Sequence, residues 1–340
     1  MIEKSFSIFL SLFFALGGPA CYSEPAVAHI SAPDRNTLVQ IAFGSCISDP
    51  SSPIWDSILA TDPDVFILLG DTVYLEHEDL GRSKRIRARF HRLFSEPGFA
   101  RLRKAIPTYA IWDDHDFGPN DGDSQFIHAD VSRMVFRDFW SLPPTILDDK
   151  GGIYGKLHLP NVTVLLTDNR SYRRNPVSGK ASQLFGPRQL AWIESELVQP
   201  RTPLVVIASG NQFLSDDTEP SEEGLWQYPA ERKRLMTAIE DSSAQVVIIS
   251  GDRHFAEILS SGAGDLSGRE ILEVTSSPLT ASLRPLETIV SQRHRKALYA
   301  GGQNFGLLTI VPERGSLSIA AEIRDKFGKR VISSELRHLK

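Results

Sequence analysis

Short apolar runs recur along this 340-residue chain, and several are almost unbroken stretches of valine, isoleucine and leucine. Such runs are typical of β-strands that other layers cover on both faces. They therefore constrain the fold to buried sheets. We predict strands at 38–43, 64–69, 108–112, 162–167, 203–208, 244–250, 270–276, 306–311 and 317–323.

Helical patterns lie between these strands, and the C-terminal third of the chain is mostly strand. Alternating β and α units followed by strands predict an α/β fold in which sheets pack together with helices outside. The sequence has no internal repeat and no low-complexity linker, so we predict a single domain over residues 29–340. We predict helices at 53–60, 83–94, 130–140, 187–198 and 230–241.

Residues 1–28 have the pattern of a signal peptide. The apolar run "SFSIFLSLFFALG" follows "MIEK", and "AVA" at 26–28 fits cleavage after Ala28. The run is too short for a transmembrane helix. We therefore expect export to the periplasm or to the exterior, with a lipid anchor on Cys21 as the weaker alternative. The net charge of −5 gives no sign of a nucleic-acid binder.

Residues that can bind metal ions follow five of the predicted strands. The C-terminal edge of strands in an α/β sheet is where sites collect, so these groups are expected to converge. Each is unremarkable alone, because an Asp after Gly is usually a turn former and a lone Cys is usually a small buried hydrophobe. Repetition at five strand ends favours a site. The candidates are Cys46, Asp71, Tyr74, Asp113, Asp114, His115, Asp116, Asn211, Gln212, Asp252 and His254.

The donor atoms divide into two groups. The thiolate of Cys46 and the phenolate of Tyr74, with Asp71 and His254, favour ferric iron, because a highly charged ion is needed to displace the phenol proton. Asp114, Asp252 and the amide oxygen of Asn211 or Gln212 are hard oxygen donors, which suit Ca²⁺, Mg²⁺ or Mn²⁺. Asp71 could bridge both ions, and two such cations suit phosphoryl displacement.

The motifs "FGSC", "LLGDTVY", "IWDDHD", "TDNRSYR" and "ISGDRH" occur in this order between residues 39 and 277. In this order they resemble the alkaline phosphatase D (PhoD-like) branch of the metallophosphoesterase superfamily. The resemblance implies a four-layer α/β/β/α sandwich with mixed sheets. It also implies Fe³⁺ and a divalent ion, often Ca²⁺. One departure is that the family's middle histidine ligand has no counterpart, although Asn211 or Gln212 follows the corresponding strand.

This resemblance implies an exported phosphatase or phosphodiesterase that uses a binuclear site and a metal-activated water on a small phosphate ester. Asp71 would bridge the metals, and His115 would protonate the leaving alkoxide. Arg170, in "DNRSYRR", is our prediction for a phosphate contact. We expect a monomer that binds no nucleic acid specifically.

Three alternatives remain open. The basic run "RSKRIRARFHR" at 82–92 would suit a phospholipase-type phosphodiesterase that contacts a membrane surface and acts on anionic lipid. Cys46 could instead be a nucleophile, although no helix signal of the expected kind follows it. A non-catalytic metal- or phosphate-binding surface protein is the third, and His115 beside the ligands argues against it.

Overall fold

The computed structural model describes residues 37–140, 152–176, 182–216, 223–261, 270–314 and 316–339. All of them belong to one compact unit, Asp34–Lys340. The predicted signal peptide and Cys21 lie outside the described residues, so the domain boundary after Ala28 stays a prediction. Within the described ranges, no helix combines the length and the apolar character that crossing a membrane requires.

The first sheet contains six strands within the described ranges, in the order β13-β12-β11-β1-β2-β3. The central strands β1, β2 and β3 are parallel, whereas β11, β12 and β13 add to β1 in antiparallel fashion. The strands are β1 (Val39–Gly44), β2 (Val65–Leu69), β3 (Thr108–Ile111), β11 (Asn304–Glu313), β12 (Ser316–Asp325) and β13 (Arg330–Leu339).

The second sheet has seven strands among the described residues, in the order β10-β8-β9-β7-β6-β5-β4. Its centre, from β5 through β6 and β7 to β9, is parallel, and the outer strands are antiparallel. The strands are β4 (Gly155–Leu159), β5 (Val162–Leu166), β6 (Leu204–Ser209), β7 (Gln245–Ser250), β8 (Ala256–Ser261), β9 (Ile271–Thr275) and β10 (Arg295–Tyr299).

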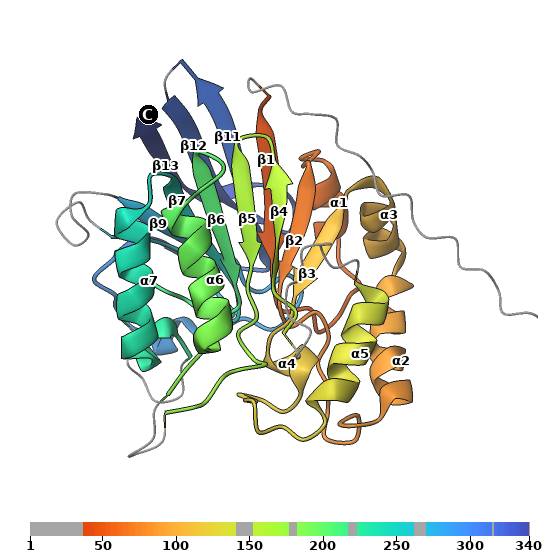
Figure 1. The fold of residues 1–340 in the computed structure, drawn as a ribbon. Coiled ribbons are helices and arrows are strands. Elements are labelled where there is room, and N and C mark those ends of the chain that lie inside the picture. The colour runs from red at the N-terminus through yellow and green to blue at the C-terminus, as the bar shows by residue number, and fades with distance from the viewer. Residues whose placement is uncertain are drawn as a thin grey trace, which may run out of the picture. The chain divides into compact units, whose positions relative to one another are not determined.

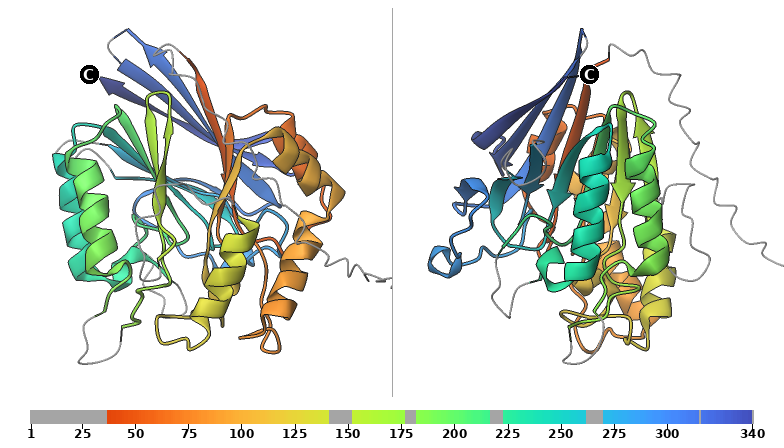
Figure 2. Two further views of the ribbon diagram at one scale, coloured as in Figure 1. Left: turned by 45° about the vertical axis from the view of Figure 1, so that its right-hand side comes forward. Right: turned by 60° about the vertical axis from the view of Figure 1, so that its left-hand side comes forward.

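Helices cover the outer faces of the two sheets (Figures 1 and 2). The first sheet is covered by α1 (Ile54–Leu59), α2 (Ser83–Phe94), α3 (Pro97–Ala105) and α5 (Ala129–Phe139). The second is covered by α6 (Gly186–Val198) and α7 (Pro229–Asp241). Short helical turns are α4 (Asp114–Phe117), η1 (Leu225–Gln227) and η2 (Leu286–Thr288).

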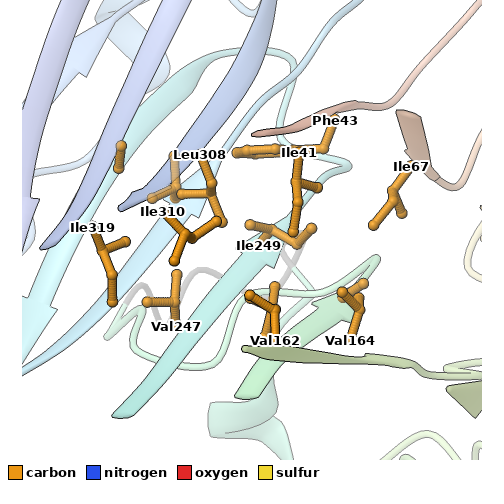
Figure 3. Packing of buried hydrophobic residues seen from close by; sticks show 14 of the residues in the cluster. Ile41, Phe43, Ile67, Val162, Val164, Val247, Ile249, Leu308, Ile310 and Ile319 are labelled. Carbon is orange, nitrogen blue, oxygen red and sulfur yellow. The ribbon is translucent and has the colours of Figure 1, made fainter. Parts of the chain in front are cut away.

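The main core lies between the two sheets. Side chains of Ile41 and Ile67 from the first sheet face Val164 and Ile249 from the second, and all four are fully buried (Figure 3). Near-continuous apolar strands form here because their other faces are buried too, against the helices. The predicted four-layer sandwich with mixed sheets is confirmed.

Each predicted strand and helix overlaps an observed one, but several observed elements were not predicted from the sequence. Helix α3 was missed because Pro97 and Gly98 look like helix breakers. In the structure Pro97 stands in the first turn, where its missing N–H costs nothing, and the Glu96 carboxylate caps the helix by accepting the Phe99 N–H at 2.6 Å. Strands β4, β8, β10 and β13 were also missed, since their apolar patterns are short or diluted by polar residues.

The predicted basic run lies on α2, whose buried residues are Ile86, Phe90 and Leu93. Several of its arginines pair with acidic side chains, such as Arg89 with Asp79 at 2.8 Å. Ion pairs of this kind are common on solvated helices, so membrane contact stays a prediction.

Candidate active site

The loops after β1 and β2 lie side by side and bring Cys46 to Asp71. The Cys46 N–H donates to the Gly70 carbonyl at 3.2 Å, and the Ile47 N–H donates to the Asp71 carbonyl at 2.8 Å. The Cys46 thiol lies 3.6 Å from Asp71 Oδ2. Both side chains are buried. The first two predicted ligands are therefore neighbours.

Gly70 allows the end of β2 to approach the end of β3. Its φ is +100°, and a Cβ at this position would lie 2.4 Å from Cβ of Asp113. A side chain here would have to displace Asp113 and with it the turn that carries Asp114 and His115.

Four of the predicted site residues have left-handed backbone conformations. The φ values are 64° for Cys46, 52° for Asp71, 68° for Asp252 and 55° for His254. For a non-glycine residue this conformation costs on the order of 1 kcal/mol, and such residues cluster at functional sites. The strand ends thus concentrate backbone strain where the predicted donors stand.

The turn α4 after β3 completes the cluster. One donor atom from each of Asp71, Asp114 and His115 lies within 4.8 Å of the others, a spacing that could hold a metal ion. The rings of Tyr74 and His115 are 4.3 Å apart, and the Tyr74 hydroxyl is 3.1 Å from Nε2 of His254. Residues from four strand ends therefore meet at one place.

A cavity of about 390 Å³ opens at this cluster, a volume typical of small-molecule sites. Cys46 and Tyr74 are not among its lining residues, but they contact residues that are. The lining residues are Asp71, Asp114, His115, Asn120, Asp121, Glu223, Asp252, Arg253, His254, Leu283, Arg284 and Pro285.

The cluster carries excess negative charge. Burial, then the neighbouring carboxylates led by Asp114, raises the pKa of Asp71 well above its ordinary value. Burial and other carboxylates likewise raise the pKa of Asp252. The pKa of the Cys46 thiol is raised by burial and by Asp71, and that of Tyr74 by burial and by Cys46. The anionic forms of all four groups need nearby positive charge.

This donor set fits metal ions. Oxygen, sulfur and imidazole donors converge, and cations would supply the positive charge that the buried anions need. The raised pKa and full burial of the Cys46 thiol also disfavour its role as a nucleophile.

Arg170 occupies a different position from the one expected of a phosphate contact. It is fully buried and does not line the cavity. Its Nε donates to Asp113 Oδ1 at 2.5 Å, and its Nη2 donates to Glu223 Oε2 at 2.5 Å. Nη2 also lies 3.4 Å from Asp114 Oδ1. Arg170 thus compensates the charge of carboxylates beside the cavity, and its contact with phosphate stays a prediction.

The two amides after β6 point to different partners. Gln212 Nε2 donates to Glu257 Oε1 at 2.6 Å and to Thr275 Oγ1 at 2.7 Å. Asn211 Nδ2 donates at 3.3 Å to Oε2 of Glu223, which lines the cavity. Neither amide lines the cavity itself, but these contacts favour Asn211 as the residue on the site side.

Several residues that line the cavity were not predicted from the sequence. Arg253 stands inside the quoted "ISGDRH" motif and could have been noted. Asp121, whose N–H donates to Asp114 Oδ2 at 2.8 Å, and Arg284 had no signal that separates them from ordinary loop residues. Glu223 lines the cavity and accepts a hydrogen bond from Arg170, and such distant pairing is not visible in sequence.

Residues 41–322 match the PhoD-like phosphatase family. The chain belongs to this family. The resemblance carried by the sequence motifs is therefore confirmed. Among curated protein sequences, none matches the chain significantly.

Solved structures of phosphatases share the fold. The chain superimposes on a structure of PhoD with a TM-score of 0.71 and 18% identity, covering 89% of this chain and 73% of that one. A purple acid phosphatase from yellow lupin (Lupinus luteus) seeds gives a TM-score of 0.59 and 11% identity, covering 88% of this chain and 54% of the other. This PhoD-like chain thus spans about half of the lupin enzyme.

Family, fold and donor cluster together identify this PhoD-like chain as a metal-dependent phosphoesterase. Its substrate is a small phosphate ester, as the family implies. The identity of the ions stays a prediction.

Proposed function

We propose that this chain hydrolyses phosphate esters at a binuclear metal site that binds Fe³⁺ and a divalent ion, foremost Ca²⁺. The observation that carries the proposal is the meeting of Asp71, Asp114 and His115 within 4.8 Å at one cavity. The proposed iron ligands are Cys46, Asp71, Tyr74 and His254, and the proposed ligands of the divalent ion are Asp71, Asp114, Asn211 and Asp252.

When bound, the two ions would act as Lewis acids that lower the pKa of a water and offset charge on the phosphoryl oxygens. Asp71 belongs to both ligand sets, and its Oδ1 accepts the backbone N–H of His115 at 3.3 Å. His115 lines the cavity and packs its ring against Tyr74. We propose that the His115 imidazole gives its proton to the leaving oxygen of the ester.

Arg253 and Arg284 both line the cavity, whereas Arg170 does not. We propose that these two arginines contact the anionic substrate. Arg284 is held by Thr288, because its Nε donates to Thr288 Oγ1 at 3.1 Å. A fixed guanidinium fits phosphate oxygens with little loss of side-chain entropy.

The test is hydrolysis of p-nitrophenyl phosphate and of its bis ester by the purified holoenzyme. We expect turnover of at least one ester, lost after chelation and regained with a divalent ion. Comparison of the two rates decides between monoesterase and diesterase activity. Absence of turnover with Fe³⁺ and each of Ca²⁺, Mn²⁺ and Mg²⁺ would contradict the proposal and favour a non-catalytic binding protein.

The His115 role is tested with leaving groups of different quality. His115→Asn should lower kcat by about a hundredfold or more for an alkyl phosphate, and by less for p-nitrophenyl phosphate, whose leaving group needs no proton. The exposed His158, on β4, gives the matched control His158→Asn. Equal losses for both leaving groups would remove His115 from the role of acid.

We also propose that the chain is exported, which the pattern at residues 1–28 supports. N-terminal sequencing after expression with the native N-terminus should find His29 first. Retention of Met1 would contradict export, and a lipid on Cys21 would select the anchored alternative.

A further inference from the structure

Two glutamates are buried on the outer face of the second sheet, Glu257 on β8 and Glu273 on β9. Leu272 and Val274, the neighbours of Glu273 along β9, belong to the core between the sheets. Since strand side chains alternate, Glu273 points to the opposite face. Burying a carboxylate destabilises the folded state unless hydrogen bonds or ion pairs compensate it. The burial of these two glutamates therefore requires an explanation.

For Glu273 the reason is the loop that follows β6 and crosses this face. Glu273 accepts the N–H of Phe213 at 2.9 Å and that of Leu214 at 2.6 Å. Glu257 is ion-paired with Arg295 at 2.6 Å, and its other oxygen accepts the side-chain amide of Gln212 at 2.6 Å. The two carboxylates therefore hold three consecutive residues, and those three directly follow Asn211.

The same network reaches the end of β7. The Ser250 hydroxyl bonds to Glu273 and lies 2.9 Å from Thr275 Oγ1. Thr275 in turn accepts from Gln212 at 2.7 Å. Ser250 stands two residues before Asp252, so one buried network holds both the loop of Asn211 and the strand end that leads to Asp252.

Neither glutamate lines the cavity. Asn211, however, donates to Glu223 in the cavity wall, and its carbonyl accepts from Ser209 Oγ at 2.8 Å. Glu273 fixes the backbone of this loop, and Asn211 at its start contacts Glu223 in the cavity wall. A shift of the loop would therefore also move Asn211 relative to the cavity.

We propose that Glu273 is a positioning residue: by fixing the loop after β6 it sets the place of Asn211, and thereby the affinity of the site for its divalent ion. This inference rests on the proposed function, in which Asn211 is a ligand. Groups that orient metal ligands from outside the ligand shell typically change metal affinity or activity by about 10- to 100-fold when removed.

Glu231 provides a matched control with a structural role. It is also buried, and its carboxylate accepts the N–H groups of Leu184 at 2.8 Å, Phe185 at 2.9 Å and Gly186 at 3.2 Å. It holds the start of α6 and does not line the cavity. Glu231→Gln therefore removes the same kind of interaction without touching the loop of Asn211.

The experiment measures Ca²⁺ and Mn²⁺ binding by calorimetry at about pH 8, on protein from which the divalent ion has been dialysed, alongside thermal melting. Glu273→Gln should raise the Kd for at least one ion about tenfold. Glu231→Gln should leave the Kd within about twofold of the wild-type value, even if it lowers the Tm as much as Glu273→Gln does. An unchanged Kd in Glu273→Gln, or an equal rise in Glu231→Gln, overturns the proposal.

A double-variant comparison tests the route of the effect. If Glu273 acts through Asn211, Glu273→Gln should add little to the Kd of a chain that already carries Asn211→Ala; two additive effects would overturn that route. Should Glu273→Gln fail to fold, Ser250→Ala, which removes one donor to the same carboxylate, is measured instead. A rise of about threefold or more supports the proposal, and an unchanged Kd overturns it. Hydrolysis by the unaltered enzyme is scored separately, so failure of the proposed function would be recognised on its own.

Discussion

Asp71 and Glu223 line the same cavity and are both buried, yet their carboxylates are compensated in different ways. Burial raises the pKa of Glu223, but Arg170 and Arg173 outweigh it and hold that pKa below its ordinary value. Burial raises the pKa of Asp71 as well, and the surrounding carboxylates raise it further. Glu223 thus has arginine partners inside the protein, whereas Asp71 is surrounded by other acidic groups.

This difference indicates which part of the cavity is built for metal ions. Buried carboxylates stay ionised only beside positive charge, and arginine supplies it permanently. At Asp71 the charge would come from bound ions, which leave the site able to accept a substrate. The Asp71 side and the Glu223 side of the cavity should therefore respond in opposite ways to substitution and to metal removal.

The largest expected effect is on catalysis. Asp71→Asn removes the residue common to both proposed ligand sets, so we expect kcat/KM to fall about a thousandfold or more. Metal content, measured by atomic emission, should fall with it. The exposed Asp49 gives the control Asp49→Asn, which should change neither quantity. Normal metal content in Asp71→Asn would show that the bridging assignment is wrong.

The two carboxylates should also affect stability with opposite signs. Glu223→Gln leaves Arg170 and Arg173 short of a partner, and breaking such a buried pair costs about 3–5 kcal/mol. Asp71→Asn should stabilise the metal-depleted protein by about 1–3 kcal/mol at about pH 8. The reason is that a carboxylate whose folded pKa is raised destabilises the fold when ionised. Denaturant unfolding in the presence of a chelator measures both values, and a shared sign would contradict the comparison.

The contribution of Glu273 to the free energy of unfolding should depend on pH. Burial, with a smaller contribution from Glu257, raises its pKa to about 7, although the N–H groups of Phe213 and Leu214 oppose the rise. The folded state then binds more protons than the unfolded state between about pH 4.5 and 7, so this residue's contribution to stability falls as the pH rises through that window.

The glutamine in Glu273→Gln does not titrate. Between about pH 5 and 7.5 the free energy of unfolding of the wild type should therefore fall by on the order of 1–3 kcal/mol relative to that of this variant. Metal-depleted samples unfolded in denaturant at the two pH values give the difference. A constant difference between wild type and variant would show that Glu273 does not titrate in this range.

The smallest effect on stability is expected for Tyr74. Burial and the nearby Cys46 raise its pKa, so its phenol stays protonated until a highly charged cation replaces the proton. The iron-loaded protein should therefore show a visible charge-transfer band that Tyr74→Phe abolishes or shifts, with a stability change of about 1 kcal/mol or less without metal. A band that persists unchanged in Tyr74→Phe would exclude this ligand.

The sequence predicted most of the strands, and the polar residues that converge at the ends of five of them, because both depend on local pattern: buried runs mark strands, and a glycine followed by a polar residue marks the turn. It also predicted the helix at 83–94 with the bounds that the structure has. What it could not supply were long-range pairings. Arg170 looks like a free loop cation until Asp113 and Glu223 are placed around it.

The choice between Asn211 and Gln212 was open for the same reason. Adjacent residues after a strand differ only in the direction in which they point, and the loop's partners decide that direction. Glu257 and Thr275, which hold Gln212, lie on strands β8 and β9 far along the chain. The glutamates beneath this loop carry no motif, so their role becomes apparent only from the hydrogen bonds.

The central claim, that two bound ions supply the positive charge at Asp71, is tested most directly by titrating metal-depleted protein. Hydrolysis of p-nitrophenyl phosphate, or of its bis ester, is followed against bound metal per chain. We expect little activity until one Fe³⁺ and one divalent ion are bound together. Full activity with a single bound ion, or with none, would contradict it.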